Sequence, residues 1–77
     1  MEFNVFLSKF VEQFRNTPIS EFTPGTNFWE LDEWSSIVAL SVVLMIEEEY
    51  GVTLRSTDVK GVRTIQELFN VVKERAR

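Results

Sequence analysis

The sequence contains no cysteine and no histidine. The first absence excludes disulfide bonds and thiolate nucleophiles, and the two together remove the usual ligands of zinc. Histidine is also the commonest general base near neutral pH. Acidic side chains alone would have to perform any catalysis, so we expect the protein not to be an enzyme. The lack of cysteine also fits a reducing compartment.

A basic patch, a long apolar run and an export signal are also missing. Eight lysines and arginines against twelve acids give a net charge of −4, whereas nucleic-acid binders usually present a basic patch or stripe. The longest apolar stretch, 42–46 with neighbours back to 37, is far too short to span a bilayer. The N-terminus lacks a basic region followed by an apolar signal core. We expect a soluble cytoplasmic protein that binds no nucleic acid and does not insert into membranes.

Apolar residues are abundant, however. They make up 44% of the 77 residues and include seven phenylalanines and two tryptophans, which is too many for a disordered chain. A chain this short can form only one modest core. We therefore expect a single domain over 1–77, in which aromatic side chains supply much of the stability.

Two contrasting segments open the chain. Apolar side chains recur at steps of three and four between 3 and 14, which predicts an amphipathic helix over about 2–16. Residues 17–34 hold both prolines and many small polar residues, which predicts a long loop. A loop of this length often has a function. We expect it to be anchored to the core by Ile19, Phe22, Phe28, Trp29, Leu31 and Trp34.

A second helix is predicted from the serine pair Ser35–Ser36 to Tyr50, with Gly51 as a left-handed C-cap. Apolar residues lie on almost every side of this helix. A helix of that kind is normally buried. We therefore expect it to be central and to contact every other element.

The remaining pattern predicts one short helical turn and a final helix. Ser56 or Thr57 can cap the short turn, which ends near Gly61. Thr64 and Glu67 are spaced as a capping box for the final helix. The apolar stripe of that helix consists of Ile65, Leu68, Phe69 and Val72. The chain is therefore predicted to be all-α.

Three motifs are shared with one known family. "Ser35-Ser36-Ile37" opens the second helix where the family has Asp-Ser-Leu, and "IEEEYGV" closes it, with Tyr50 and Gly51 fourteen and fifteen residues after Ser36. "DVKGVRTIQELFNVV" is similar to the family's third and fourth helices. In their order and spacing over the whole chain, these motifs resemble the acyl carrier protein family. The resemblance implies a small antiparallel four-helix bundle, with three main helices, one short helix and a long loop between the first two helices.

The resemblance also implies a function and a cofactor. Ser36 aligns with the family serine that receives 4′-phosphopantetheine from coenzyme A, and Ser35 stands in place of the family's Asp. The protein would carry acyl intermediates as thioesters for fatty-acid, polyketide or related lipid biosynthesis. Its partners would be a phosphopantetheinyl transferase and acyl-processing enzymes with basic docking surfaces.

The two serines suit separate roles. A serine before an apolar run is far more often a helix cap than a modification site. Here Ser35 can act as the N-cap, which leaves the Ser36 hydroxyl free to point outward at the first helical position. Free backbone N–H groups and the helix dipole would favour a phosphodiester on Ser36.

The resemblance further implies a pocket for the acyl chain and a surface for partners. The pocket candidates are Leu40, Val43, Leu44, Met45 and Ile46. Plain core packing is the alternative interpretation of each. The candidates for recognition of basic partners are the acids Asp32, Glu33, Glu47, Glu48 and Glu49. A solvated helix face is the alternative interpretation of the three consecutive acids.

A small helical protein–protein interaction module without a covalent cofactor is the alternative function. Ser36 would then serve only as a cap, and the apolar excess of the second helix would form a groove or a dimer face. As a carrier, the protein is expected to be a monomer.

Overall fold

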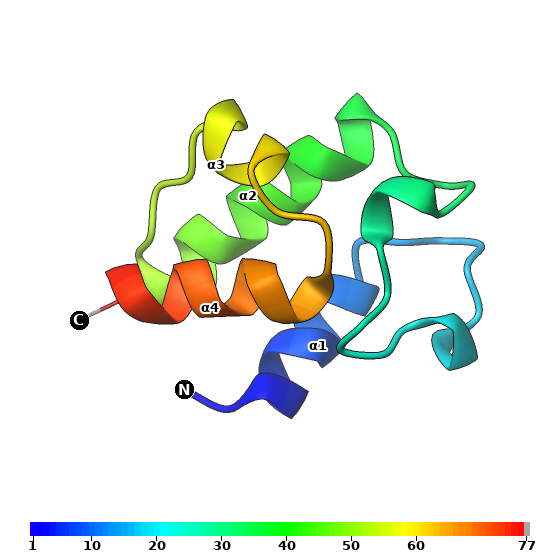
Figure 1. Ribbon diagram of the computed structural model, residues 1–77, viewed down its shortest axis with the longest axis horizontal. Helices are drawn as coiled ribbons and strands as arrows, with labels where there is room; N and C mark the ends of the chain where they lie inside the picture. The colour runs from blue at the N-terminus through cyan, green and yellow to red at the C-terminus, as the bar shows by residue number, and fades with distance from the viewer. Residues whose placement is uncertain (77) are drawn as a thin grey trace.

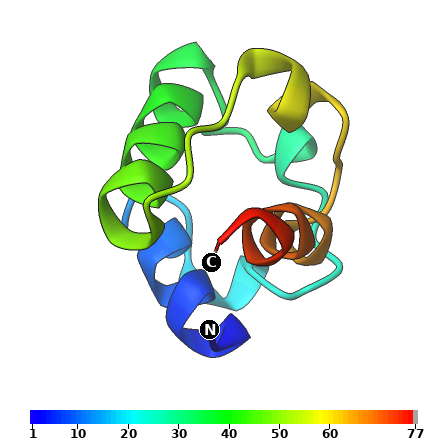
Figure 2. The same cartoon turned by 90° about the vertical axis from the view of Figure 1, so that its left-hand side faces the viewer.

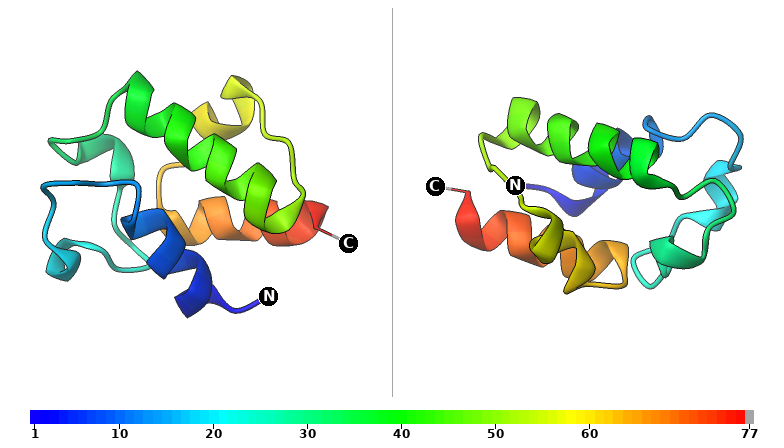
Figure 3. Two further views of the ribbon diagram at one scale, coloured as in Figure 1. Left: turned by 180° about the vertical axis from the view of Figure 1, so that it is seen from behind. Right: turned by 90° about the horizontal axis from the view of Figure 1, so that it is seen from above.

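The computed structural model describes residues 1–76 and is an all-helical bundle without strands in that range. Its helices are α1 (Phe3–Val11), α2 (Ser36–Tyr50), the short α3 (Ser56–Lys60) and α4 (Ile65–Arg75) (Figure 1). Helices α2 and α4 run in the same direction along the bundle, and α1 runs in the opposite direction (Figure 3). The predicted all-α bundle is therefore confirmed. None of the helices within 1–76 is long and apolar enough to cross a membrane.

The core is built largely from phenylalanine rings. Phe6, Phe10 and Phe28 are completely buried, and all the buried residues of the described chain join one apolar cluster. The ring of Phe10 lies 5.7 Å from that of Phe28, and the ring of Phe6 lies 5.4 Å from that of Phe69. In the end-on view of Figure 2, the four helices surround a common centre. Segments distant in sequence therefore meet through aromatic contacts, which add to the energy of simple burial.

Helix α1 ends at Val11, earlier than the predicted end near 16. The backbone N–H groups of Arg15 and Asn16 donate to the carboxylate of Glu33, at 2.6 and 2.9 Å, instead of to carbonyls one turn earlier. The hydroxyl of Thr17 donates to the same carboxylate at 2.7 Å. These three donors lower the pKa of Glu33, with the Arg15 N–H as the largest cause. A carboxylate from a distant loop thus replaces the helix as the acceptor for these donors.

The predicted long loop contains two 3₁₀ turns, η1 (Ile19–Glu21) and η2 (Phe28–Glu30). Five of its six predicted anchors are buried or partly buried against the core, but Ile19 is exposed and that prediction was wrong. Hydrogen bonds also tie the loop to the segment before α4: the N–H of Phe28 donates to the carbonyl of Arg63 at 3.1 Å, and the N–H of Ile65 donates to the carbonyl of Thr26 at 3.2 Å. The loop is therefore held in place from both sides.

The ends of α2 are as predicted, but its burial is not. Gly51 has a φ of 67°, the left-handed conformation that glycine adopts without strain, and its N–H donates to the carbonyl of Glu47. Val42, Met45 and Ile46 face the core. The three large apolar residues exposed on this helix are Ile37, Leu40 and Leu44. Helix α2 therefore lies at the outside of the bundle (Figures 2 and 3), because a core this small covers only one of its sides.

The predicted capping box of α4 is confirmed, since Thr64 and Glu67 exchange backbone-to-side-chain hydrogen bonds at 3.0 and 3.1 Å. The N-cap of α3 is Arg55, not Ser56 or Thr57.

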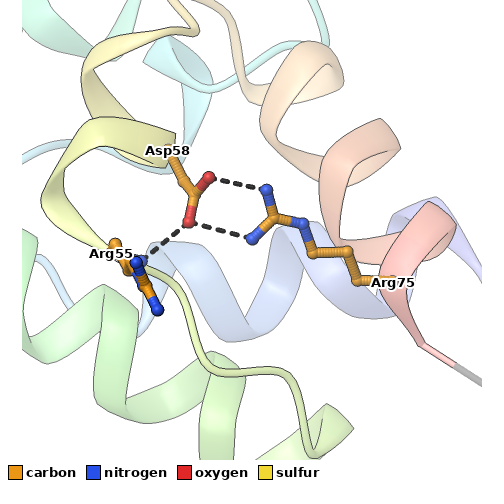
Figure 4. A network of polar contacts seen from close by, with 3 residues as sticks. All are labelled: Arg55, Asp58 and Arg75. Carbon is orange, nitrogen blue, oxygen red and sulfur yellow. Dashed lines mark hydrogen bonds and ion pairs between the residues drawn. The ribbon is translucent and has the colours of Figure 1, made fainter.

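Helix α3 is held by one carboxylate. Asp58 reaches back to accept the N–H of Arg55 at 2.8 Å, and it also accepts both guanidinium nitrogens of Arg75 at 2.6 and 2.9 Å (Figure 4). Such a two-pronged pair fixes orientation as well as distance. A five-residue helix is too short to be stable alone, so this contact with the end of α4 helps to keep it folded.

We expect the Asp58–Arg75 pair to make stability depend on pH. The Arg75 guanidinium, followed by the N–H of Arg55, lowers the pKa of Asp58 to about 2 from 3.8. An ionised Asp58 therefore stabilises the folded state above about pH 4, and this contribution disappears as the pH falls through about 2. Arg75→Gln should lower the melting temperature at neutral pH. The difference in melting temperature between this variant and wild type should shrink as the pH falls from about 4 to about 2, as followed by circular dichroism.

Lys73→Gln is the matched control, because it removes a positive charge from α4 without touching the Asp58 pair. The difference in melting temperature between Lys73→Gln and wild type should not shrink as Asp58 is protonated. If the melting temperature of Arg75→Gln differs from that of wild type by the same amount from neutral pH down to about 2, the Asp58–Arg75 pair does not cause the pH dependence.

Candidate functional site

The two serines at the start of α2 have different environments. Ser35 is the N-cap, with extended backbone, and its hydroxyl oxygen accepts the N–H of Val38 at 3.3 Å. Ser36 is the first helical residue and is exposed. Within the described part of the chain, no hydrogen bond engages the Ser36 hydroxyl. Ser35 therefore holds the helix end, while Ser36 presents a free hydroxyl.

Both serines lie at the edge of a cavity of about 630 Å³ between α2, α3 and the end of the long loop. The cavity is lined by Trp29, Trp34, Ser35, Ser36, Ala39, Leu40, Val43, Leu54, Ser56, Val59 and Lys60. Most of these side chains are apolar, and hydroxyl groups occur on both helices. The cavity has the size and character of a pocket for a small apolar ligand.

The two tryptophans form a fixed wall of this cavity. The indole N–H of Trp29 donates to the carbonyl of Val62 at 2.9 Å, and the Arg63 guanidinium lies 5.5 Å from the centre of the Trp29 ring. The ring of Trp34 lies 4.8 Å from Phe28 and 5.7 Å from Trp29. These contacts hold both indoles in place, so this wall is preformed.

Helix α3 and the segment before it form the opposite wall. Leu54 and Val59 are buried, and Lys60 is the only charged side chain among the lining residues. The sequence patterns did not identify Leu54, Ser56, Val59 or Lys60 as site residues. Their position depends on how α3 packs over α2, and the only local sign was that two apolar residues stand among turn-forming ones.

The structure does not bring the five predicted pocket residues to one place. Leu40 and Val43 line the cavity beside Ser36. Leu44 and Met45 line a separate, more polar hollow of about 330 Å³ between α1 and α2. Ile46 is completely buried in the core. The apolar lining beside Ser36 on α2 therefore consists of Ala39, Leu40 and Val43.

The five predicted recognition acids are also divided. Asp32 and Glu33 precede α2, whereas the three consecutive glutamates form its last turn, about 20 Å further along the helix axis. Asp32 is exposed, and Glu33 accepts the N–H groups of Arg15 and Asn16 beyond α1. These acids do not form one continuous acidic surface around Ser36.

Two of the three glutamates at the end of α2 also have internal partners. Glu49 forms an ion pair with Lys9 at 2.9 Å, which raises the pKa of that lysine. Glu47 accepts the hydroxyl of Thr53 at 3.0 Å. Glu48 is exposed and lines the hollow between α1 and α2. Glu48 and Asp32 are therefore the acids best placed to meet a partner.

The chemistry of the site follows from these positions. Neither a carboxylate nor an imidazole lines the cavity, so the two groups that most often activate a serine hydroxyl as a base are missing from its walls, and Lys60 is the one ionisable side chain there. The part of the chain that the structure covers also holds no cluster of acids suited to a metal ion. The N–H groups of the first turn of α2 favour an anion at this position. The arrangement fits a serine that is modified by another protein.

The comparisons with known proteins agree with this geometry. No curated protein matches the chain. A family model described as the phosphopantetheine attachment site matches residues 6–72, from α1 into α4, and includes both serines and every residue that lines the cavity. The cofactor of this family is covalently bound 4′-phosphopantetheine, and its domains are typically carriers of that group rather than catalysts. The chain belongs to the phosphopantetheine attachment site family, in agreement with its resemblance to acyl carrier proteins.

Proposed function

We propose that the protein is an acyl carrier protein in which Ser36 bears the 4′-phosphopantetheine arm. The observation that supports this most directly is the difference between the two serines. Ser35 is engaged as the N-cap, whereas the Ser36 hydroxyl is exposed and free at the edge of a largely apolar cavity. An attachment site must be reached by a second enzyme, and Ser36 meets that requirement.

The residues around Ser36 fit the attached group. The first turn of α2 offers backbone N–H groups to a phosphodiester, and no carboxylate lines the adjacent cavity to repel it. The arm supplies a terminal thiol, on which acyl groups are held as thioesters. Because the thiol comes from the arm, a chain without cysteine or histidine can take part in this chemistry without being an enzyme.

The cavity is the proposed shelter for an acyl chain. Its walls are the two indoles, Leu40 and Val43 on α2, and the buried Val59 on α3. Each methylene group removed from water contributes about 0.8 kcal/mol. We place the acyl pocket here, rather than along the whole apolar length of α2, because Met45 and Ile46 lie in the core.

The carrier would work with other enzymes in the cytoplasm as a monomer. A phosphopantetheinyl transferase would load Ser36, and acyl-processing enzymes of fatty-acid, polyketide or related biosynthesis would use the thioester. Basic surfaces on these enzymes would be steered by the negative net charge of the carrier.

Loading by coenzyme A tests the assignment of Ser36. After incubation with coenzyme A and a broad-specificity phosphopantetheinyl transferase, the intact protein should gain the mass of one phosphopantetheine group. Ser36→Ala should gain nothing, because the acceptor hydroxyl is removed. Intact-mass spectrometry gives the result directly.

Ser35→Asp is the matched control, because aspartate caps a helix as well as serine does but offers no hydroxyl. This variant should load like wild type. Loading that survives Ser36→Ala but fails in Ser35→Asp would move the attachment site by one residue. Wild-type protein that gains no mass would contradict the carrier function.

A cavity-filling variant tests the proposed acyl pocket. Loading wild type with an octanoyl-bearing arm should raise its melting temperature by at least about 10 °C relative to the arm alone, because burial of a few methylenes contributes about 2 kcal/mol or more. Ala39→Leu should reduce this gain, since its side chain occupies part of the cavity from α2. Ser41→Leu adds the same side chain to α2 outside the cavity and should keep the gain. An equal gain in the wild type and in Ala39→Leu would place the acyl chain elsewhere.

A further inference from the structure

Two polar side chains stand on the α3 wall of the cavity beside Ser36. Ser56 and Lys60 both line the cavity, and their spacing of four residues places them on one face of α3, one turn apart. Both are exposed, so they stand where the cavity opens to solvent. The buried Val59 forms the apolar part of the same wall. The α3 wall therefore offers an ammonium and a hydroxyl group beside apolar surface, whereas the lining of α2 beyond the serine pair is apolar.

The positive charge of Lys60 is not compensated inside the protein. Within residues 1–76, the two ion pairs do not involve Lys60. The one carboxylate on α3 belongs to Asp58, which pairs with Arg75 instead (Figure 4). No carboxylate lines the cavity. An anion that enters the cavity therefore meets one positive charge and no negative charge.

The backbone that carries Lys60 is held in place. One guanidinium nitrogen of Arg63 donates to the carbonyl of Lys60 at 2.8 Å and to the carbonyl of Val62 at 3.0 Å. The same guanidinium group lies 5.5 Å from the centre of the Trp29 ring. These contacts tie the end of α3 to the indole wall of the cavity. The Lys60 ammonium group is therefore presented from a preformed backbone.

The loaded carrier would offer Lys60 two kinds of anion, the phosphodiester on Ser36 and a carboxylate at the far end of the acyl chain. The N–H groups of the first turn of α2 already suit the phosphodiester. A carboxylate on the acyl chain has no cationic partner among the lining residues except Lys60. It also accepts hydrogen bonds from both an ammonium and a hydroxyl group. The favoured ligand is therefore the carboxylate of a dicarboxylic acyl chain.

We propose that Lys60, assisted by Ser56, recognises a terminal carboxylate on the acyl chain, so that the cavity favours dicarboxylic over simple fatty acyl groups. The proposal rests on the carrier function proposed above. A carboxylate loses hydration beside apolar walls, and a paired ammonium group offsets this cost. The methylene groups of the same chain would lie against the apolar lining.

Suberoyl and octanoyl arms test the proposal, because the two chains have the same length and only suberoyl ends in a carboxylate. Each arm is attached from its coenzyme A thioester by a broad-specificity phosphopantetheinyl transferase, and intact mass confirms complete loading. The measured quantity is the gain in melting temperature over the same protein with the unacylated arm. Lys60→Gln should lower the suberoyl gain by about 3 °C, because an ion pair at the edge of the cavity is lost, and should leave the octanoyl gain unchanged.

Two further variants separate charge recognition from other effects. Lys60→Arg keeps the positive charge and should retain most of the suberoyl gain. Lys73→Gln removes a lysine charge from α4, outside the cavity, and is the matched control. Both of its gains should equal those of wild type.

The outcomes distinguish this proposal from the carrier function. If wild type loads but Lys60→Gln changes both gains equally or changes neither, carboxylate recognition is wrong and the carrier function stands. If Lys60→Gln lowers only the melting temperature of the form with the unacylated arm, relative to the unloaded protein, Lys60 pairs with the phosphodiester instead. If wild type gains no mass with any coenzyme A thioester or with coenzyme A itself, the carrier function fails.

Discussion

The packing of aromatic rings between the long loop and the core is the interaction on which the site depends. Trp34 stands directly before the serine pair, and its ring contacts both Phe28 from the same loop and Phe14 beyond α1. Each aromatic pair contributes about 0.5–1.5 kcal/mol beyond burial. Without these contacts, a loop of this length would leave the start of α2 free to move. The rings that stabilise a small core therefore also position Ser36, so that stability and the geometry of the site are closely linked.

The carboxylates divide into those that hold the fold and those that face outward. Glu33 holds the chain just beyond α1, Asp58 holds α3, and Glu67 caps α4, each by accepting backbone N–H groups. Such hydrogen bonds to charged acceptors are stronger than neutral ones. These carboxylates remain ionised and count toward the net charge of −4, but none of them lines the cavity beside Ser36. Charge on this protein can steer an approaching molecule from a distance, but the cavity next to Ser36 is largely apolar.

The features that could be predicted from the sequence are those set by neighbours in the chain. The caps at Ser35 and Gly51 and the capping box of Thr64 and Glu67 depend on residues within one turn, and they are found where predicted. The position of the chain after α1 depends on Glu33, which no local pattern connects with it. The walls of the cavity likewise depend on how α3 packs over α2. The position of Ser36 at the helix start was therefore predictable, whereas the cavity beside it was not.

The burial of α2 was misjudged for a reason that bears on function. Apolar residues on all sides predict a central helix, but a chain of 77 residues has too few other elements to cover all of these sides. One side joins the core through Val42 and Ile46, a second lines the cavity through Val43, and a third faces solvent through Ile37. Folding accounts for the first side alone. The other two meet at Leu40, which both lines the cavity and is 58% exposed. The side chain of Leu40, one turn after Ser36, therefore joins the apolar lining of the cavity to the exposed apolar side of α2.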